Sequence, residues 1–268
     1  MSDSEQVLRV TRDGGIVLIE WTQPRIRNPL NNALKQAMDE TVRSLEGDKD
    51  LTAVVLTGSD GVFSGGGDVK AMSRERASGE YDGAEDYLAR MRHSHGWLRI
   101  LKELPVPVIA AIDGPAAGAG LSIALLCDFV LVSDRAKFNA SFCKIGLIPD
   151  LGLFYTLPRI VGLQRARELF YTGRTFDAEE AHRLGIALEV VPHAGLMDRA
   201  WDVARQMEQS SRSAFSLTKQ ISGRALESDF ETMLALEMQA QAMLLASRYN
   251  KEAVDRFTAK EPLKFNFS

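Results

Sequence analysis

The sequence contains few cysteines and few histidines. Its 268 residues include Cys127 and Cys143 and four histidines. Neither residue type has the spacing of a metal site or of a disulfide framework, since His93 and His95 would point to different sides of a helix. We therefore expect no metal. Both cysteines have apolar neighbours, which predicts small core residues in a protein of a reducing compartment.

Long hydrophobic runs and an excess of positive charge are absent as well. No stretch reaches the roughly 18 uninterrupted apolar residues that a membrane-spanning helix needs. The net charge is −4, and the basic residues form no patch typical of nucleic-acid binding. The first five residues, MSDSE, are polar and acidic, unlike a signal or transit peptide. We therefore expect a cytoplasmic protein with no membrane or nucleic-acid partner.

Hydrophobic periodicity predicts alternating strands and helices, followed by helices alone. Apolar and β-branched runs predict strands at 7–10, 15–21, 53–57, 108–112, 129–132, 137–140 and 188–191. Helical spacing predicts helices at 31–45, 87–104, 164–171, 178–184, 195–207, 213–226, 230–246 and 251–257. Residues 73–83 have the composition of a loop. The pattern predicts an α/β core over residues 1–192 and an all-helical region over 193–268, for packing and oligomerisation.

Two loops rich in small residues each follow a predicted strand and lead into a helix. They are FSGGGD at 63–68 and GPAAGAG at 114–120. Free amides at such a helix start can bind a phosphate or carboxylate, or stabilise an oxyanion, and the loops alone leave these choices open. A dinucleotide site is disfavoured because Ile123 replaces the third glycine of its motif. A nucleophilic Ser122 is disfavoured because the closing glycine is missing.

A third loop, GLIPDLG at 146–152, holds one acidic residue among apolar neighbours. If Asp150 is buried, its pKa is raised and it is suited to proton abstraction. Its place before a predicted helix is equally typical of an N-cap aspartate. Both interpretations stay open on the pattern alone.

Taken in order, these motifs resemble the crotonase (enoyl-CoA hydratase/isomerase) superfamily over roughly residues 7–265. The matching segments are NPLN at 28–31, FSGGGDVKAM at 63–72, IDGPAAGAG at 112–120, CD at 127–128 and TGR at 172–174. The resemblance implies a crotonase-like ββα spiral core with an all-helical C-terminal region. It also implies an acyl-CoA thioester substrate, no cofactor besides the coenzyme A of that substrate, and a homotrimer or a dimer of trimers.

The resemblance also assigns roles to single residues. The amides of Gly67 and Ala119 would hold the thioester oxygen as an oxyanion hole. We place the coenzyme A near a set of loop and tail residues: Arg25, Arg27, Ser64, Gly65, Gly66, Asp68, Val69, Lys260 and Lys264. The acyl pocket would be lined by Met72, Met91, Ser122, Phe142, Leu147 and Phe154.

The chain departs from the hydratase pattern at two positions. A typical hydratase of the family activates water with two glutamates, and the matching positions here are Ser122 and Phe142. Asp150 matches the single acid of some isomerases, in particular the Δ3,Δ2-enoyl-CoA isomerases and the ring-epoxide isomerases of phenylacetate breakdown. One carboxylate is enough to move a proton between C2 and C4. We therefore expect an enoyl-CoA isomerase with Asp150 as its acid/base.

Three alternatives to the isomerase stay open. The first is an enoyl-CoA hydratase of fatty-acid β-oxidation. The second is an acyl-CoA-binding relative without catalysis. The third is a nucleotide-binding oxidoreductase.

Overall fold

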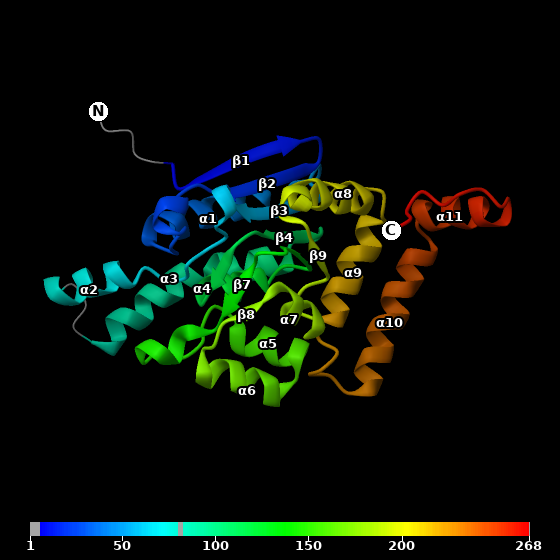
Figure 1. The fold of residues 1–268 in the computed structure, drawn as a ribbon. Coiled ribbons are helices and arrows are strands. Elements are labelled where there is room, and N and C mark those ends of the chain that lie inside the picture. Colours follow the sequence, from blue (N-terminus) through cyan, green and yellow to red (C-terminus); the bar gives the residue numbers. More distant parts are fainter. Residues whose placement is uncertain (1–5, 80–82, 268) are drawn as a thin grey trace.

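The structure is a computed structural model that describes residues 6–79 and 83–267. Its centre is a six-stranded sheet in the order β1-β2-β3-β4-β6-β9 (Figure 1). The strands are β1 (Leu8–Asp13), β2 (Ile16–Trp21), β3 (Ala53–Gly58), β4 (Val108–Ile112), β6 (Phe129–Ser133) and β9 (Glu189–Val191). β1 pairs antiparallel with β2, and all further pairs are parallel. The predicted strands of this sheet and the expected α/β fold class are confirmed.

A second, three-stranded sheet continues from the first. It consists of β5 (Pro115–Ala117), β7 (Lys137–Asn139) and β8 (Phe176–Asp177), with β7 in the middle. The chain passes from β4 to β5 through Asp113, whose carboxylate accepts hydrogen bonds from Ser133 Oγ at 2.7 Å and Arg135 Nε at 2.6 Å. These bonds fix the turn between β4 and β5 and thereby the position of β5.

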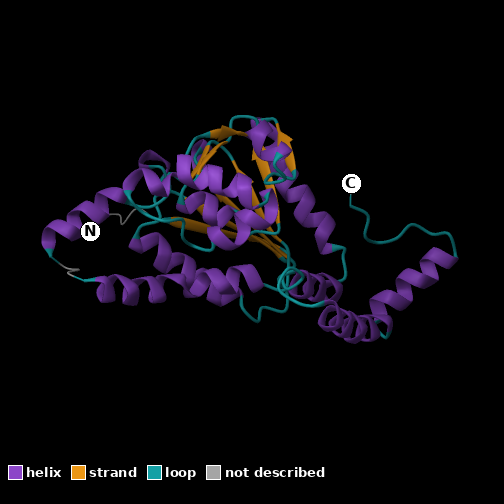
Figure 2. Ribbon diagram, turned by 90° about the horizontal axis from the view of Figure 1, so that it is seen from below, coloured by secondary structure: helices purple, strands orange, loops and turns teal. Residues whose placement is uncertain are grey.

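Helices cover both faces of the large sheet (Figure 2). On one face lie α1 (Asn32–Leu45), α3 (Ala84–Glu103), α4 (Ala119–Ala124), α5 (Leu153–Val161), α6 (Leu163–Thr172) and α7 (Ala178–Arg183), which share a large apolar cluster with the sheet. On the other face α8 (Leu196–Glu208) packs on a smaller cluster. Strand side chains alternate between the two clusters, as Val54 and Val55 do.

Residues 69–78 form a helix, α2 (Val69–Ser78), so the prediction of a loop is wrong for 73–78. Asp68 caps this helix by accepting a hydrogen bond from the Ala71 amide at 2.8 Å. Arg, Glu and Ala in this segment are also good helix formers, which outweighs their polar character. The helix ends at Gly79, with φ of +68°, and residues 80–82 of the predicted loop lie outside the described residues.

After α8 every regular element up to Thr258 is a helix, as expected, and residues 259–267 form a tail without helix or strand. Of the helices α9 (Arg212–Ser222), α10 (Phe230–Leu245) and α11 (Arg248–Thr258), α9 packs on the smaller cluster through Phe215, and α10 and α11 lie farther from the sheets (Figures 1 and 2). Ala240 is the buried residue of α10, while Met238 and Met243 are each 67% exposed. Whether residue 192 marks a boundary between two units stays a prediction.

The remaining short elements are 3-10 turns: η1 (Pro24–Ile26), η2 (Ser59–Gly61), η3 (Ser141–Ile145) and η4 (His193–Gly195). Cys143 lies in η3 and is exposed, so the expectation of two core cysteines is wrong for it, because this turn runs along the surface. Cys127 is half-buried. Among the described helices, none combines the length and apolar composition needed to cross a membrane.

Candidate active site

The two small-residue loops lie side by side and are joined by backbone hydrogen bonds. The Ser64 amide donates to the Pro115 carbonyl at 2.8 Å, and the Ser64 carbonyl accepts from the Ala117 amide at 3.0 Å. On the other side of the first loop, the Leu30 amide donates to the Gly66 carbonyl at 2.8 Å. The segment 64–67 is therefore held between β5 and the start of α1.

Gly67 and Ala119, the predicted oxyanion donors, belong to these two loops. Ala119 is the first residue of α4, so its amide has no acceptor within the helix. Gly118 before it has φ of +48° and ψ of −114°, a conformation open mainly to glycine. In the part of the chain that the structure describes, neither the Gly67 nor the Ala119 amide donates to a protein acceptor. Both amides are available to an oxygen of a bound molecule.

Buried polar side chains support the first loop from behind. Ser64 Oγ donates to the Asn28 carbonyl at 2.8 Å and accepts from the Gly66 amide at 3.1 Å. Asn28 Nδ2 donates to the Val62 carbonyl at 2.7 Å. The Ser64 side chain is fully buried and holds the loop in place, and its contact with coenzyme A stays a prediction. The role of Asn28 was not found from the sequence, where its only mark is the matching NPLN segment.

Ser122 and Phe142 occupy the positions where the resemblance places the glutamates of a hydratase. The Ser122 side chain is fully buried, and its Oγ donates back to the Gly118 carbonyl at 3.2 Å. The Phe142 ring lies against Gly118, with ring carbons 3.7 and 3.9 Å from where a β-carbon on that glycine would stand. A hydroxyl bound to its own helix and an aromatic ring therefore flank the loop before Ala119.

Asp150 is half-buried, and its Oδ1 has no hydrogen-bond partner among the described residues. Burial raises the pKa of this carboxyl group, while the charge of Lys35 acts in the opposite direction. The N-cap of α5 is Gly152, and no side chain caps that helix, so the capping interpretation of Asp150 is wrong. A partly desolvated carboxyl group with one oxygen free of hydrogen bonds is typical of an acid/base residue.

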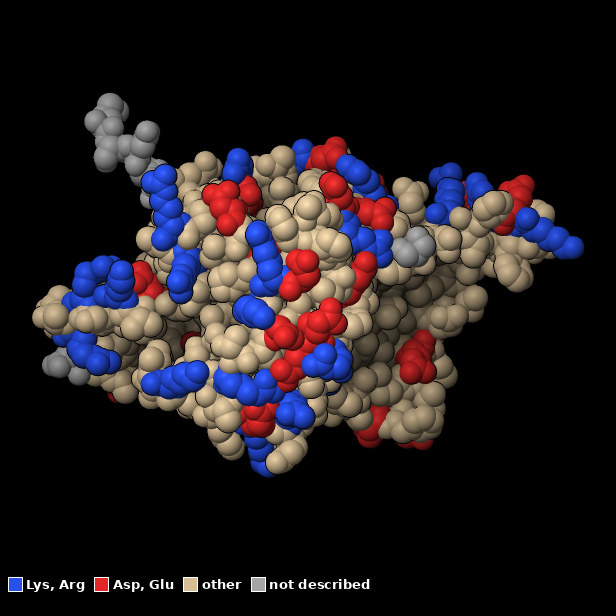
Figure 3. All heavy atoms as spheres, in the orientation of Figure 1, with Lys and Arg blue, Asp and Glu red and all other residues tan. Residues whose placement is uncertain are grey.

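The predicted contacts of coenzyme A fall into two groups. Arg27 lies beside the first loop, because its carbonyl accepts from the Gly65 amide at 2.6 Å, and Arg25 is exposed in the adjoining turn. Basic side chains also gather over α2 on the face shown in Figure 3. Lys260 and Lys264 lie in the tail after α11, on the side of the molecule opposite α2 (Figure 1). Lys264 Nζ pairs with Glu252 at 2.6 Å.

The predicted acyl-pocket residues are also spread unevenly. Met72 lies at the site, because its Cε is 3.3 Å from where a β-carbon on Gly67 would stand. Met91 and Leu147 are 40% and 44% exposed. Phe154 is 52% exposed and packs edge-on against the ring of Phe170 of α6, at 5.1 Å between centroids. Phe154 therefore makes its aromatic contact with α6.

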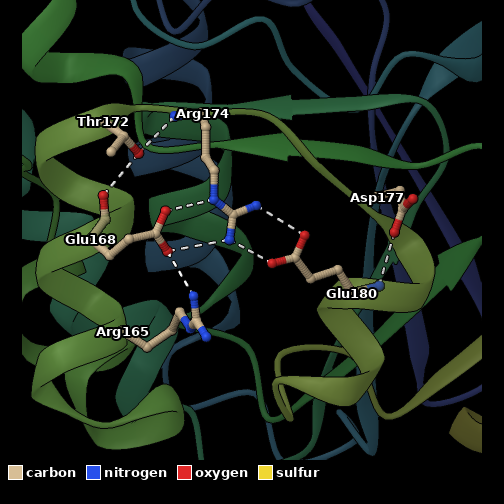
Figure 4. Close-up of polar contacts among 6 residues, drawn as sticks. All are labelled: Arg165, Glu168, Thr172, Arg174, Asp177 and Glu180. Carbon is tan, nitrogen blue, oxygen red and sulfur yellow. Dashed lines mark hydrogen bonds and ion pairs between the residues drawn. The ribbon is translucent and has the colours of Figure 1, made fainter.

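Arg174 forms a charged cluster with Glu168 and Glu180 (Figure 4). Its guanidinium donates to Glu168 Oε1 at 2.6 Å and to Glu180 Oε2 at 2.9 Å, joining the end of α6 to α7. Next to it, a β-carbon on Gly173 would stand 3.0 Å from the α-carbon of Ser141, the first residue of η3. The cluster thereby fixes the segment on which η3 rests.

This architecture, two small-residue loops with free amides joined above a mostly parallel sheet, is that of a crotonase-fold acyl-CoA enzyme. The sequence model of the family described as Enoyl-CoA hydratase/isomerase matches residues 11–268. The chain belongs to the enoyl-CoA hydratase/isomerase family.

Similar proteins cover nearly the whole chain. A probable enoyl-CoA hydratase of Rhizobium meliloti (strain 1021) is 32% identical over 98% of this chain and 98% of its own length. The 1,2-epoxyphenylacetyl-CoA isomerase of Escherichia coli (strain K12) is 32% identical over 94% of this chain and 95% of its own. The crystal structure of an enoyl-CoA hydratase/isomerase from Cupriavidus metallidurans CH34 superposes with a TM-score of 0.91, at 34% identity, covering 99% of this chain and 98% of that one. The predicted superfamily is confirmed.

Proposed function

We propose that the protein is an enoyl-CoA isomerase that moves a double bond from C3 to C2 of an acyl-CoA thioester. The observation that supports the proposal concerns three side chains: burial raises the pKa of Asp150 and leaves its Oδ1 without a hydrogen bond among the described residues, whereas Ser122 and Phe142 stand where the resemblance places the two acids of a hydratase. Hydration needs a carboxylate that activates water, whereas a double-bond shift needs one base on one face of the substrate.

In the proposed mechanism the thioester oxygen lies between the amides of Gly67 and Ala119. Ionised Asp150 takes a proton from C2, and the electrons of that C–H bond form an enolate whose negative charge the two amides stabilise. The same carboxyl group then returns the proton at C4, and the double bond moves from C3–C4 to C2–C3. No external acid, base or redox partner is required, and we propose that the enzyme uses no cofactor besides the coenzyme A of its substrate.

Substituting Asp150 tests the mechanism directly. Asp150→Asn keeps the size of the side chain and removes its basicity, so turnover of a 3-enoyl-CoA should fall by about two to four orders of magnitude. Binding of the thioester should be largely retained. The matched control is Asp198→Asn, an exposed aspartate on α8, across the sheet from the site. Near wild-type isomerisation by Asp150→Asn would show that another group is the base.

A panel of 2- and 3-enoyl-CoA esters separates the remaining functions. A hydratase is the second candidate, because relatives with this name match the chain along its length. It would add water to a 2-enoyl-CoA and remove the absorbance of the conjugated thioester. An acyl-CoA-binding protein would bind every ester and convert none. A nucleotide-binding oxidoreductase would show a thermal shift with NAD(P) instead of with acyl-CoA.

We further propose that the chain acts in the cytoplasm as a homotrimer or a dimer of trimers. The support is α10, where Met238, Met243 and Leu245 are more than 60% exposed. The hollow beside α10 also shows few charged side chains (Figure 3). Sedimentation should give a trimeric or hexameric mass, and Met238→Glu should lower it. Lys251→Glu on α11 is the control. A monomeric wild-type protein would contradict the assembly.

A further inference from the structure

Leu151, the residue directly after Asp150, has a backbone conformation that leucine rarely adopts. Its φ is +54°, in the left-handed region, where the β-carbon of any residue other than glycine crowds a backbone carbonyl. Of the non-glycine residues with positive φ in the ranges 6–79 and 83–267, only Asn28 and Leu151 are buried. Asn28 supports the oxyanion loop, and Leu151 adjoins the proposed base. Strained conformations of this kind are often found at functional sites.

Leu151 and Gly152 are the two central residues of a tight turn between Asp150 and α5. Gly152 has φ of +85° and ψ of 3°, and the Leu153 amide closes the turn by donating to the Asp150 carbonyl at 3.1 Å. Positive φ at both central positions is the pattern of a type I′ turn, which usually has asparagine, aspartate or glycine at the first of them. A leucine at this position indicates that contacts outside the turn stabilise it.

The side chain of Leu151 makes such contacts. It is 5% exposed and belongs to the large apolar cluster between the sheet and the helices. Gly152 lies against Leu126, shortly after α4, because a β-carbon on Gly152 would stand 3.4 Å from Leu126 Cδ2. Burial of a leucine side chain typically contributes more free energy than a left-handed conformation costs. Packing of Leu151 can therefore stabilise the turn.

The helix that follows the turn has anchors of its own. Leu153 and Leu157 of α5 are fully buried. Tyr155 Oη donates to the carbonyl of Gly223, at the end of α9, at 2.7 Å. These contacts hold α5 in place without the help of the turn. A change of conformation at Leu151 would therefore act mainly on the residues before α5.

A different conformation of the same residues would engage the Asp150 carboxyl group. If Leu151 and Gly152 were right-handed, α5 would begin two residues earlier, with Asp150 at its N-cap. Aspartate is a favourable N-cap residue, and its carboxylate would accept a hydrogen bond from the Leu153 amide, three residues on. In the structure the backbone carbonyl of Asp150 accepts from that amide, and its Oδ1 has no partner among the described residues.

We propose that Leu151 is a positioning residue for Asp150: burial of its side chain selects the left-handed turn and thereby prevents the Asp150 carboxyl group from capping α5. The carboxyl group is then available to a bound molecule. The structural part of this inference, the choice between turn and cap, stands independently of the reaction. Its catalytic part, the use of the free carboxyl group as a base, rests on the proposed function.

Two substitutions of Leu151 in the full-length protein separate the turn from the packing. Leu151→Ala and Leu151→Gly both remove most of the buried side chain. Glycine adopts positive φ freely and is a poor helix former, whereas alanine disfavours positive φ and is the best helix former. If Leu151 served packing alone, alanine would be the better replacement, because it keeps one more buried carbon. The proposed role predicts the opposite order.

The matched control is the same pair of substitutions at Leu157, which is fully buried inside α5. Its backbone is right-handed, so Leu157→Ala should be more stable than Leu157→Gly. Thermal unfolding establishes which variants are folded. If the small replacements of Leu151 do not fold, Leu151→Met and Leu151→Ile form a second pair of similar volume. The β-branch of isoleucine disfavours positive φ, so it should behave as alanine does and methionine as the wild type.

The primary measurement is the crystal structure of each folded variant, which is independent of activity. Leu151→Ala should have a right-handed residue 151 and an Asp150 carboxylate within about 3.2 Å of the Leu153 amide nitrogen. Leu151→Gly should keep the positive φ and the free carboxyl group. A left-handed turn with a free carboxyl group in Leu151→Ala would overturn the proposal, and so would a capping Asp150 in Leu151→Gly.

The second measurement is steady-state turnover of a 3-enoyl-CoA. The kcat of Leu151→Ala should lie about 5- to 30-fold below that of Leu151→Gly, the factor that corresponds to the cost of a left-handed conformation for a residue with a β-carbon. The KM should differ much less. Equal kcat values, with Asp150 capping α5 in the alanine variant alone, would overturn the role of Leu151 in the reaction. A wild type that converts no 3-enoyl-CoA would show instead that the proposed function is wrong, while the crystal structures decide between turn and cap.

Discussion

Gly66 faces the amide of Ala119 across the gap between the two small-residue loops. A β-carbon built on Gly66 would stand 3.7 Å from the Ala119 nitrogen. It would also stand only 2.8 Å from the carbonyl oxygen of Ala117, closer than a real β-carbon comes to a backbone atom. With φ of +99°, this position also disfavours any other residue. The spacing of the proposed oxyanion donors therefore depends on Gly66 having no side chain.

Gly66→Ala should separate the two loops and impair the oxyanion hole. Loss of one oxyanion donor typically lowers kcat by about 100- to 1000-fold, and we expect a fall of this order with a smaller change in KM. Steady-state kinetics with the substrate found in the ester panel measure it. The control is Gly47→Ala, where φ is +84° but no atom lies within 4 Å of the added carbon. That variant should lose about 1–2 kcal/mol of stability and keep its activity.

The raised pKa of Asp150 predicts how its substitution changes stability with pH. A carboxyl group whose pKa is higher in the folded state favours the folded state most when it is protonated, and this contribution is lost as pH rises through the folded-state pKa. Asparagine does not ionise, so Asp150→Asn removes this loss of folded-state stability at high pH. The variant should therefore be more stable than the wild type at pH 7, and the difference should shrink as pH falls toward 4. Urea unfolding at both pH values measures it, and a variant less stable at pH 7 would contradict the assignment.

Much of the fold could be predicted because its strands alternate or run apolar and its helices carry periodic apolar faces. Val108–Ile112 is an example, a wholly buried strand bounded by Pro107 and Asp113. The helix over 69–78 could not be predicted from the same signals. None of its residues is buried, so it has no apolar face, and it depends on a cap at Asp68.

The parts of the candidate site that consist of backbone amides could be predicted from the sequence. The parts in which side chains from distant segments meet could be predicted less well. The free amides of the two loops could be predicted because glycine and alanine loops before helices expose amides, and the resemblance pointed to Gly67 and Ala119 among them. The partial burial of His95 gave no signal, because it arises only when α1 and α3 pack together. The burial of Ser64 was hidden for the same reason, since its partner is the carbonyl of Asn28.

Arg174→Met should destabilise the protein. It removes the hydrogen-bonded ion pairs of Arg174 with Glu168 and with Glu180 (Figure 4). Arg174 is the link between these two carboxylates. We expect a loss of about 1–3 kcal/mol in urea unfolding, because the network is partly buried and bidentate. Arg99→Met is the control: its pair with Glu103 is exposed, with 82% of the arginine side chain accessible, and should contribute little. Equal effects of the two variants would contradict a special role for Arg174.

The same cluster has a pH dependence of defined sign. The guanidinium of Arg174 holds the pKa of Glu168 and that of Glu180 below their usual values. A lowered carboxyl pKa stabilises the folded state above the unfolded-state pKa, and this contribution is lost as pH falls through the folded-state value. The difference between wild type and Arg174→Met should therefore be full at pH 7 and shrink below about pH 4. A difference that persists at pH 3 would point to packing of the arginine stem instead.

Asn28→Ala should affect stability and catalysis together. The Asn28 side chain is 1% exposed, accepts from the Gln23 amide at 2.6 Å and donates to the carbonyls of Val62 and Phe63 at 2.7 and 3.3 Å. Alanine would leave these three buried backbone groups without their partner, and we expect a loss of about 2–4 kcal/mol. Because Phe63 leads directly into the oxyanion loop, kcat should fall as well.

Asn28→Gly distinguishes the lost hydrogen bonds from the backbone conformation, which has φ of +43° at this position. Glycine adopts that conformation freely, so it removes the bonds without the strain that alanine adds. If the bonds hold the loop, both variants should lose a similar share of kcat, and alanine should be the less stable of the two by about 1 kcal/mol. A glycine variant with wild-type kcat would show that the packing of Phe63 against Trp21, at 5.1 Å between ring centroids, is sufficient to hold the loop.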